Sequence, residues 1–262
     1  MFISLQENLC TFPSERIVTM IWSENKTVSP HDLDFNNVMS ASAVLRSLQD
    51  AAYSQMYYNP PSMDQLRADG KIFLLSRISM GIYAPLKVCQ SFVSQTWACE
   101  SKGASFLRCS RLMRGDETIA ELSATWALVD AETGKLLRVT EYPQNYSNEP
   151  PLTMDIPSRL RIPRDTEMKL VGEYRVSYND VDINRHVNNT NYPDILCGFI
   201  PAMEGKRIIK LCINYNHEAP LGDTLKIYRT EGEEEDSYYF RTLRSDGQIN
   251  IEAYIVLDEV DS

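Results

Sequence analysis

The chain of 262 residues has a formal net charge of −10 and is 43 % hydrophobic. This length suits two modest domains or one large one, with apolar residues enough for an ordinary core. The acidic balance argues against a general nucleic-acid binder, which needs clustered Lys and Arg to neutralise phosphates, and against binding to an anionic membrane. No apolar run approaches the roughly 18 residues of a membrane span, and the N-terminal stretch lacks the basic start of a signal peptide. We therefore expect a cytoplasmic protein.

The first half begins with a strand expected at residues 16–23, followed by the polar stretch 32-DLDFN-36. An amphipathic helix is expected next, because apolar residues recur at i, i+3 and i+4 between residues 38 and 56. Ser40 or Ser42 is expected to cap its start. Four strand-like runs separated by turn signals complete this half, at residues 71–83, 91–100, 105–114 and 119–130.

The second half repeats this order. A strand is expected at residues 169–178, followed by a second polar stretch, 180-DVDINRHVNN-189, and a shorter helix near residues 190–200. Four more strands are expected at residues 207–217, 224–231, 237–244 and 249–258. The intervening segment is rich in Pro, Asn and Ser, which is typical of an extended linker. We predict an N-terminal domain over residues 1–142, a linker over 143–166 and a C-terminal domain over 167–262.

A strand, a helix and four strands, written twice, predict an α+β protein. In each unit an antiparallel sheet wraps a central helix. Because each sheet has a single helix to cover it, two units pairing side by side is a natural way to complete the core. This pattern is typical of the hot-dog fold, here as a tandem double hot-dog within one chain.

The two polar stretches differ at one informative position. Three polar residues of the first stretch align with three of the second, which predicts a shared structural need for turns and caps: Asp32 with Asp180, Asp34 with Asp182, and Asn36 with Asn184. Val38, however, stands where the second stretch has His186. A histidine titrates near neutrality and can move a proton or hold a water. We therefore expect Asn184 and His186 to be functional, with Asp182 fixing the loop or the histidine tautomer.

A carboxylate in the same unit completes this constellation. Glu218 follows the strand at 207–217, whereas Tyr83 stands at the position judged equivalent in the first half. Strict alternation would place Glu218 on the polar face of its strand, away from the site. A bulge or twist near Ala219-Pro220 is therefore required to turn it toward His186. His31 and His217 are interpreted as surface or structural residues.

The start of the second helix provides candidate oxyanion donors. Pro193 fits a first helical turn, where its missing N–H costs nothing. The backbone N–H groups from Val187 and Asn188 up to Tyr192 would then be free to hold a carbonyl oxygen that gains charge. The sequence has no G-x-S-x-G, HExxH, Walker or GxGxxG motif. Its six cysteines lack CxxC spacing and are expected to be free thiols. The simplest chemistry is therefore attack of water on an activated carbonyl, without a metal.

Two motifs resemble the acyl-acyl-carrier-protein (acyl-ACP) thioesterase family, in its bacterial form. The stretch 182-DINRHVNN-189 is similar to the family's Asp-x-Asn-x-His pattern, and 215-YNHEAPLGD-223 to its Tyr-x-x-Glu-x-x-x-Asp pattern. Parts of the first half are also similar, so the resemblance covers roughly residues 16–258. It implies a cytosolic hydrolase that cuts fatty acyl thioesters from acyl carrier protein. The implied catalytic residues are Asp182, Asn184, His186 and Glu218; Ala219 stands where the plant pattern has Cys.

We therefore expect hydrolysis of acyl-ACP in the second unit, without a cofactor beyond the phosphopantetheine arm of the substrate. The first unit would be a silent copy whose helix lines an acyl tunnel through Val44, Leu48 and Met56. Because the carrier is acidic, its docking face is expected at 159-RLRIPR-164 or 206-KRIIK-210. The alternatives are an acyl-CoA thioesterase, a hot-dog hydratase or dehydratase, and a non-catalytic acyl-binding module. The chain could act as a monomer of two fused units or as a homodimer.

Overall fold

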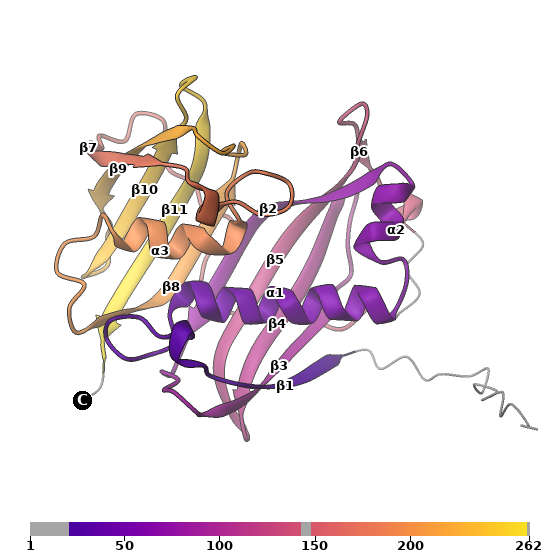
Figure 1. Ribbon diagram of the computed structural model, residues 1–262, viewed down its shortest axis with the longest axis horizontal. Helices are drawn as coiled ribbons and strands as arrows, with labels where there is room; N and C mark the ends of the chain where they lie inside the picture. The colour runs from indigo at the N-terminus through magenta and orange to yellow at the C-terminus, as the bar shows by residue number, and fades with distance from the viewer. Residues whose placement is uncertain (1–20, 143–147, 261–262) are drawn as a thin grey trace, which may run out of the picture.

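The computed structural model describes residues 21–142 and 148–260. Within these residues one antiparallel sheet of eleven strands runs through the whole protein, and the helices lie against one of its faces (Figure 1). No helix in these ranges is long and apolar enough to cross a membrane.

The first unit has the strand order β1-β3-β4-β5-β2. Its strands are β1 (Trp22–Thr27), β2 (Lys71–Ile82), β3 (Ser91–Ala98), β4 (Ser105–Arg114) and β5 (Glu117–Asp130), with the short β6 (Leu136–Leu137) paired to β5. The expected central helix is α1 (Ala41–Tyr58), and Ser40 caps it by accepting the N–H of Ala43 at 3.1 Å. The strand expected at 16–23 is β1 from Trp22 onward, whereas residues 16–20 lie outside the described ranges.

The second unit has the mirrored strand order β8-β11-β10-β9-β7. Its strands are β7 (Lys169–Arg175), β8 (Lys206–Tyr215), β9 (Thr224–Glu231), β10 (Ser237–Leu243) and β11 (Ile249–Glu259). The helix α3 (Tyr192–Cys197) covers them and follows the 3-10 turn η4 (Asn189–Asn191). Pro193 occupies its first turn, as expected.

The two units join where β2 pairs antiparallel with β8, with Ile78 opposite Ile213 and Met80 opposite Leu211. One buried cluster extends across this seam and includes α1 and α3. The helices touch where the N–H of Asp194 donates to Ser42 Oγ at 3.1 Å. The fold is therefore the expected tandem double hot-dog, with one shared core.

One helix was not predicted. After α1 the chain forms α2 (Met63–Ala68), which lies beyond the C-terminal end of α1 (Figure 1). Its start has a capping box: Ser62 Oγ accepts the N–H of Gln65, and Gln65 Oε1 accepts the N–H of Ser62. The pattern Ser-x-x-Gln after Pro60-Pro61 is a sequence signal for such a start. The second unit has no counterpart of this helix among the described residues.

Candidate active site

The second polar stretch forms a tight loop that presents His186. The N–H of Asp182 donates to the carbonyl of His186 at 3.1 Å, and the N–H of Arg185 donates to the carbonyl of Asp182 at 2.9 Å. Arg185 takes a left-handed backbone conformation with φ of 67°. The carboxylate of Asp182 accepts the backbone N–H of Asn184 at 2.8 Å and its side-chain amide at 3.1 Å. Asp182 thus holds the loop by an Asx turn.

This loop places His186 beside Glu218, the two residues on which the site predicted from the sequence depends. His186 Nε2 lies 3.3 Å from Glu218 Oε1. The loop is joined to the segment of Glu218 by backbone bonds on both sides: Val187 N–H to Ala219 O at 2.9 Å, and Leu221 N–H to Arg185 O at 3.1 Å. The pairing of these two segments therefore sets the distance between the imidazole and the carboxylate.

A β-bulge turns Glu218 toward the histidine. The N–H groups of Asn216 and His217 both donate to the carbonyl of Asn250, at 2.9 and 3.0 Å. Two residues opposite one partner shift the alternation of side chains by one position. Glu218 is thereby moved off the face of Asn214 and Asn216 and onto the face of His186. The bulge required by the sequence is present.

The first unit has the same bulge, which changes one sequence alignment. The N–H groups of Tyr83 and Ala84 both donate to Ile119 O, and the N–H of Met39 donates to Leu86 O at 2.8 Å. Leu86 is therefore the counterpart of Ala219, and Pro85 is the counterpart of Glu218. The expected equivalence of Tyr83 with Glu218 is wrong, because the two Ala-Pro-Leu stretches are offset by two residues. The first unit still has no carboxylate at this position.

The predicted oxyanion donors are wrong. The N–H of Val187 donates to Ala219 O at 2.9 Å, and the N–H of Asn188 donates to Asp180 O at 2.8 Å. The N–H of Thr190 is capped by Asn188 Oδ1 at 3.0 Å. These donors are used within the fold, because they tie the His186 loop to its neighbours. They are therefore not available to a substrate oxygen.

Asn184 contacts a residue of the first unit that the sequence did not indicate. Arg67 Nη2 donates to Asn184 Oδ1 at 3.1 Å, so α2 reaches across to the candidate site. The opposite end of the same amide donates to Asp182 Oδ2. The amide is thus held at both ends. The capping box that marks α2 was the available sequence signal, but the 117-residue separation of the contact leaves no local trace.

A buried polar network supports the strand end beneath Glu218. Asn250 is fully buried, and its amide donates to the Tyr192 hydroxyl at 2.8 Å and to the carbonyl of His217 at 2.6 Å. The Tyr215 hydroxyl donates to Asn189 O at 3.1 Å. Burial raises the pKa of Tyr192, and the nearby negative charge of Glu218 raises it further, so this phenol stays protonated. The network fixes the bulge and the start of α3 relative to each other.

Asp180 has a structural role, as its alignment with Asp32 predicts. Its carboxylate accepts the Tyr174 hydroxyl at 2.6 Å, and both the backbone N–H and the hydroxyl of Ser177, at 2.6 and 2.7 Å. Burial tends to raise the pKa of Asp180, but these bonds together outweigh it and lower the pKa below its usual value. His31 is exposed, and His217 Nδ1 lies 2.8 Å from the carbonyl of Ile249.

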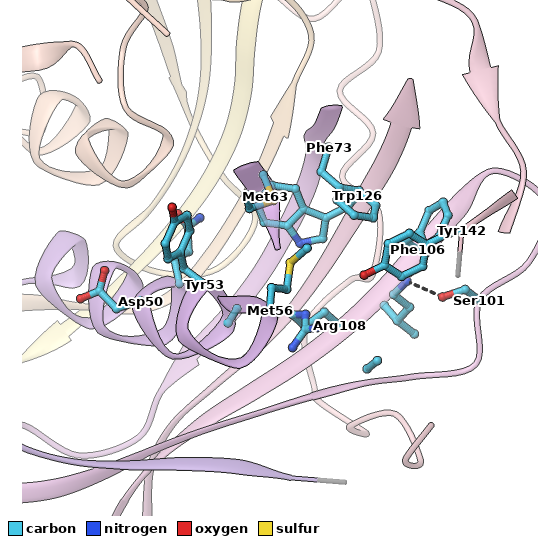
Figure 2. Close-up of a pocket in the computed structure, with 14 residues that line it drawn as sticks. Asp50, Tyr53, Met56, Met63, Phe73, Ser101, Phe106, Arg108, Trp126 and Tyr142 are labelled. Atoms are coloured by element: carbon cyan, nitrogen blue, oxygen red, sulfur yellow. Dashed lines mark hydrogen bonds between the residues drawn. The ribbon is translucent and has the colours of Figure 1, made fainter. Parts of the chain in front are cut away.

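A cavity of about 240 Å³ lies between α1, α2 and the sheet of the first unit. Met56, Met63, Phe73 and Trp126 lie around this space (Figure 2). Of the residues expected to line a tunnel, Met56 does so. Val44 and Leu48 do not, because they point from the other face of α1 into the shared core. The lining residues are mainly apolar and aromatic, with Gln49, Asp50 and Arg108 among the polar ones.

Comparison with known proteins shows which family the second unit resembles. Residues 164–258 match the family model of the acyl-ACP thioesterase C-terminal domain. Over 218 residues, or 76 % of this chain, the sequence is 19 % identical to a chloroplastic palmitoyl-acyl carrier protein thioesterase of Cuphea hookeriana. The second unit of this chain is therefore similar to the C-terminal domain of acyl-ACP thioesterases. The match spans 52 % of the Cuphea protein, so this chain corresponds to about half the length of that curated relative.

Two solved structures of acyl-ACP thioesterases have the same fold over nearly their whole length. The enzyme from Bacteroides thetaiotaomicron is 20 % identical, with a TM-score of 0.82 over 91 % of this chain and 98 % of its own. The 12:0-ACP thioesterase from Umbellularia californica is 13 % identical, with a TM-score of 0.78 over 92 % of this chain and 98 % of its own. At these identities the likeness establishes the double hot-dog architecture.

Proposed function

We propose that this protein hydrolyses fatty acyl-ACP thioesters to free fatty acid and holo-ACP, which ends chain elongation. The observation that carries the proposal is the 3.3 Å approach of His186 Nε2 to Glu218 Oε1 in the second unit. The first unit has the same loop and the same bulge, but holds Val38 and Pro85 at the equivalent positions. Acid–base groups in one copy alone fit a catalytic role better than a structural one.

In this mechanism Glu218 orients the imidazole. With Nε2 donating to Glu218, Nδ1 keeps its lone pair and can take a proton from water. The water oxygen attacks the thioester carbonyl carbon, the carbon–sulfur bond breaks, and the imidazolium returns the proton to the leaving thiolate. Asp182 holds the loop. One N–H of the Asn184 amide is bound to Asp182, so its second N–H is the proposed oxyanion donor in place of Val187 and Asn188.

The cavity of the first unit is the proposed acyl site. Met63 lines it, and Arg67, one turn further along α2, contacts Asn184. The cavity and the proposed catalytic loop therefore flank the same short helix. Apolar and aromatic walls suit an alkyl chain, whose burial is favourable in proportion to its area. The first unit is accordingly proposed to be catalytically silent and to bind the chain.

The proposed setting is the cytoplasm, with acyl carrier protein as the partner that delivers the substrate. The cysteines within the described residues are free thiols, which suits a reducing compartment. The proposed reaction needs no cofactor other than the phosphopantetheine arm that the substrate brings.

Single substitutions at the proposed site test the function. We expect His186→Ala, Asn184→Ala and Glu218→Gln each to lower release of fatty acid from acyl-ACP, by about 10²- to 10⁴-fold for the acid–base pair. His31→Ala is the matched control, because His31 is exposed and lies outside the loop. Mass spectrometry of the products separates free acid from the water adduct that a hydratase would form. Near-wild-type turnover in all three site variants would overturn the proposal.

A further inference from the structure

The two basic stretches of the sequence are treated differently by the fold. In 206–210 every charge is engaged: Lys206 pairs with Asp236 at 2.7 Å, Lys210 pairs with Glu234 at 2.9 Å, and Arg207 donates to Ile82 O at 3.0 Å. This stretch therefore has little free charge to offer a partner.

In the linker stretch 159–162, exposed arginines alternate with buried apolar residues. Leu160 and Ile162 are buried over the outer side of β8 and β11, whereas Arg159 and Arg161 are exposed. The backbone between them is pinned, because the Asn214 amide donates to Leu160 O at 3.0 Å. The two guanidinium groups are thus carried on an ordered segment.

Arg159 and Arg161 meet a third arginine at a cavity of about 350 Å³. Arg77, on β2 beside the seam, also lines it, and its Nε is buried without a hydrogen-bond partner. Burial, together with the positive charge of Arg159, lowers the pKa of Arg77. Within the described part of the chain, none of these three guanidinium groups has a hydrogen bond or an ion pair. We call this site the arginine cavity.

The carboxylate that lines the arginine cavity does not neutralise it. Glu252 lines the cavity but is bound by Arg241, at 2.8 and 3.0 Å. In the adjoining hollow, which shares Arg159 and Arg161, Glu234 is held by Lys210, whereas Asp155 and Glu233 line that hollow and not the arginine cavity. Three positive charges thus remain without a partner in a chain whose net charge is −10. The buried Arg77 Nε, which lacks a hydrogen-bond partner, would gain one from an anion in the cavity.

We propose that the arginine cavity binds a phosphate group. Guanidinium groups match phosphate oxygens in paired, charge-assisted hydrogen bonds, and several arginines converging on one hollow suit a compact anion. Asn216 lines the cavity and lies two residues before Glu218, which the bulge turns to the other face of the sheet, so a substrate arm bound in the cavity would pass over this strand end. The phosphodiester of the substrate's phosphopantetheine arm is one source of the group, which rests on the proposed function. Free phosphate is the other.

Thermal unfolding with inorganic phosphate tests the site without any reference to activity. At constant ionic strength, with chloride as the comparison, we expect phosphate to raise the Tm of the wild type. Arg159→Glu and Arg161→Glu should abolish this shift. Arg164→Glu is the matched control, because it makes the same charge change in the same exposed linker but lies outside the cavity. No shift in the wild type, or equal shifts in all four proteins, would overturn the proposal.

Two small thioesters distinguish the sources. Acyl-4′-phosphopantetheine and acyl-pantetheine differ in the phosphate alone. If the substrate arm occupies the cavity, Arg159→Glu should raise the KM of the phosphorylated thioester about tenfold and leave that of acyl-pantetheine unchanged. Unchanged KM values together with a lost phosphate shift would assign the cavity to free phosphate. A wild type that releases no fatty acid from acyl-ACP would overturn the proposed function, while the Tm measurement would still decide the site.

Discussion

The imidazole of His186 is 20 % exposed, whereas the carboxylate of Glu218 is 59 % exposed. A hydrogen bond from a neutral imidazole to a carboxylate in contact with water contributes little, because water competes for both groups. The same pair interacts more strongly once a bound substrate displaces water and lowers the local dielectric. The hydrogen bond between His186 and Glu218 should therefore be stronger in the complex with the acyl thioester.

Arg67 is expected to act through Asn184. Arg67→Ala removes the hydrogen bond to Asn184 Oδ1 and frees one end of the amide. We expect kcat to fall about fivefold, corresponding to about 1 kcal/mol for a partly exposed bond, with little change in KM. Steady-state kinetics with acyl-ACP measures both parameters.

A structural role for Arg67 would give a different pattern. Arg67→Lys should recover part of the lost kcat, since a lysine can still donate to Asn184. In the double variant with Asn184→Ala, the loss of Arg67 should cost nothing more. Additive losses in that cycle would contradict the positioning role.

Asp180 is expected to contribute pH-dependent stability. Its folded-state pKa is lowered, so its contribution is complete above the unfolded value of about 3.9 and is lost as the pH falls through the folded value. Asp180→Asn should lower the free energy of unfolding by about 2 kcal/mol at pH 7, with the difference from wild type shrinking below pH 4. Urea unfolding at several pH values measures this. Asp69→Asn, at an exposed position, is the control, and a pH-independent difference would contradict the assignment.

At the level of elements, the two units differ mainly in their helices. The helix α1 has 18 residues, whereas α3 has six. The C-terminal turns of α1, from Ala52 to Met56, and the added α2 enclose the cavity of the first unit. The short α3 instead follows directly from the His186 loop through η4. One helix thus frames space for a ligand while the other anchors the proposed catalytic loop.

Filling the cavity should change the acyl chains that are accepted. Ala52 is half-buried and lines the cavity, so Ala52→Phe places a ring in the space proposed for the end of the chain. We expect the acids released from a mixed acyl-ACP pool to become shorter, as measured by mass spectrometry. Arg46→Phe, at an exposed position of the same helix, should leave the product distribution unchanged. If Ala52→Phe released the same acids as the wild type, the acyl chain would have to bind outside this cavity.

Across the whole molecule, contacts between the units are reciprocal. Asn36, in the first polar stretch, donates to Met203 O at 3.0 Å and Lys206 O at 2.8 Å in the second unit, and accepts the N–H of Gly205 at 2.8 Å. Its counterpart Asn184 accepts from Arg67 in the first unit. Equivalent asparagines therefore each bind across to the other unit, but only Asn184 lies beside a histidine and a carboxylate.

The continuous sheet and shared core should make unfolding cooperative. We expect one calorimetric transition whose calorimetric and van't Hoff enthalpies agree. Met80→Ala, at the β2–β8 seam, should lower its Tm without splitting it, at a cost of about 2–5 kcal/mol. Two resolved transitions would show that the units unfold separately.

The sequence alone predicted α1, α3, the long strands and their doubled order, and it singled out His186 as the candidate histidine. Helix and strand periods extend over adjacent residues, and the repeat of Asp and Asn around His186 is visible in the letters. The need for a bulge before Glu218 also followed from strict alternation. The helix α2 was missed although its capping box is local, because six residues give too little periodicity.

Contacts between segments that are distant in the sequence were decided only by the tertiary structure. Three features depend on where separate segments meet. Pro85 is the counterpart of Glu218, the N–H groups of Val187 and Asn188 are used within the fold, and Arg67 contacts Asn184. Backbone donors are identical in every residue but proline, so the sequence does not specify which carbonyl each one binds. The burial of a side chain on one helix face or the other likewise moved Val44 and Leu48 from the expected tunnel into the core. The surroundings of the charged residues also depend on the tertiary structure. The basic stretches 159–164 and 206–210 look alike in sequence, but Lys206 and Lys210 lie beside carboxylates, whereas Arg159 and Arg161 lie beside Arg77.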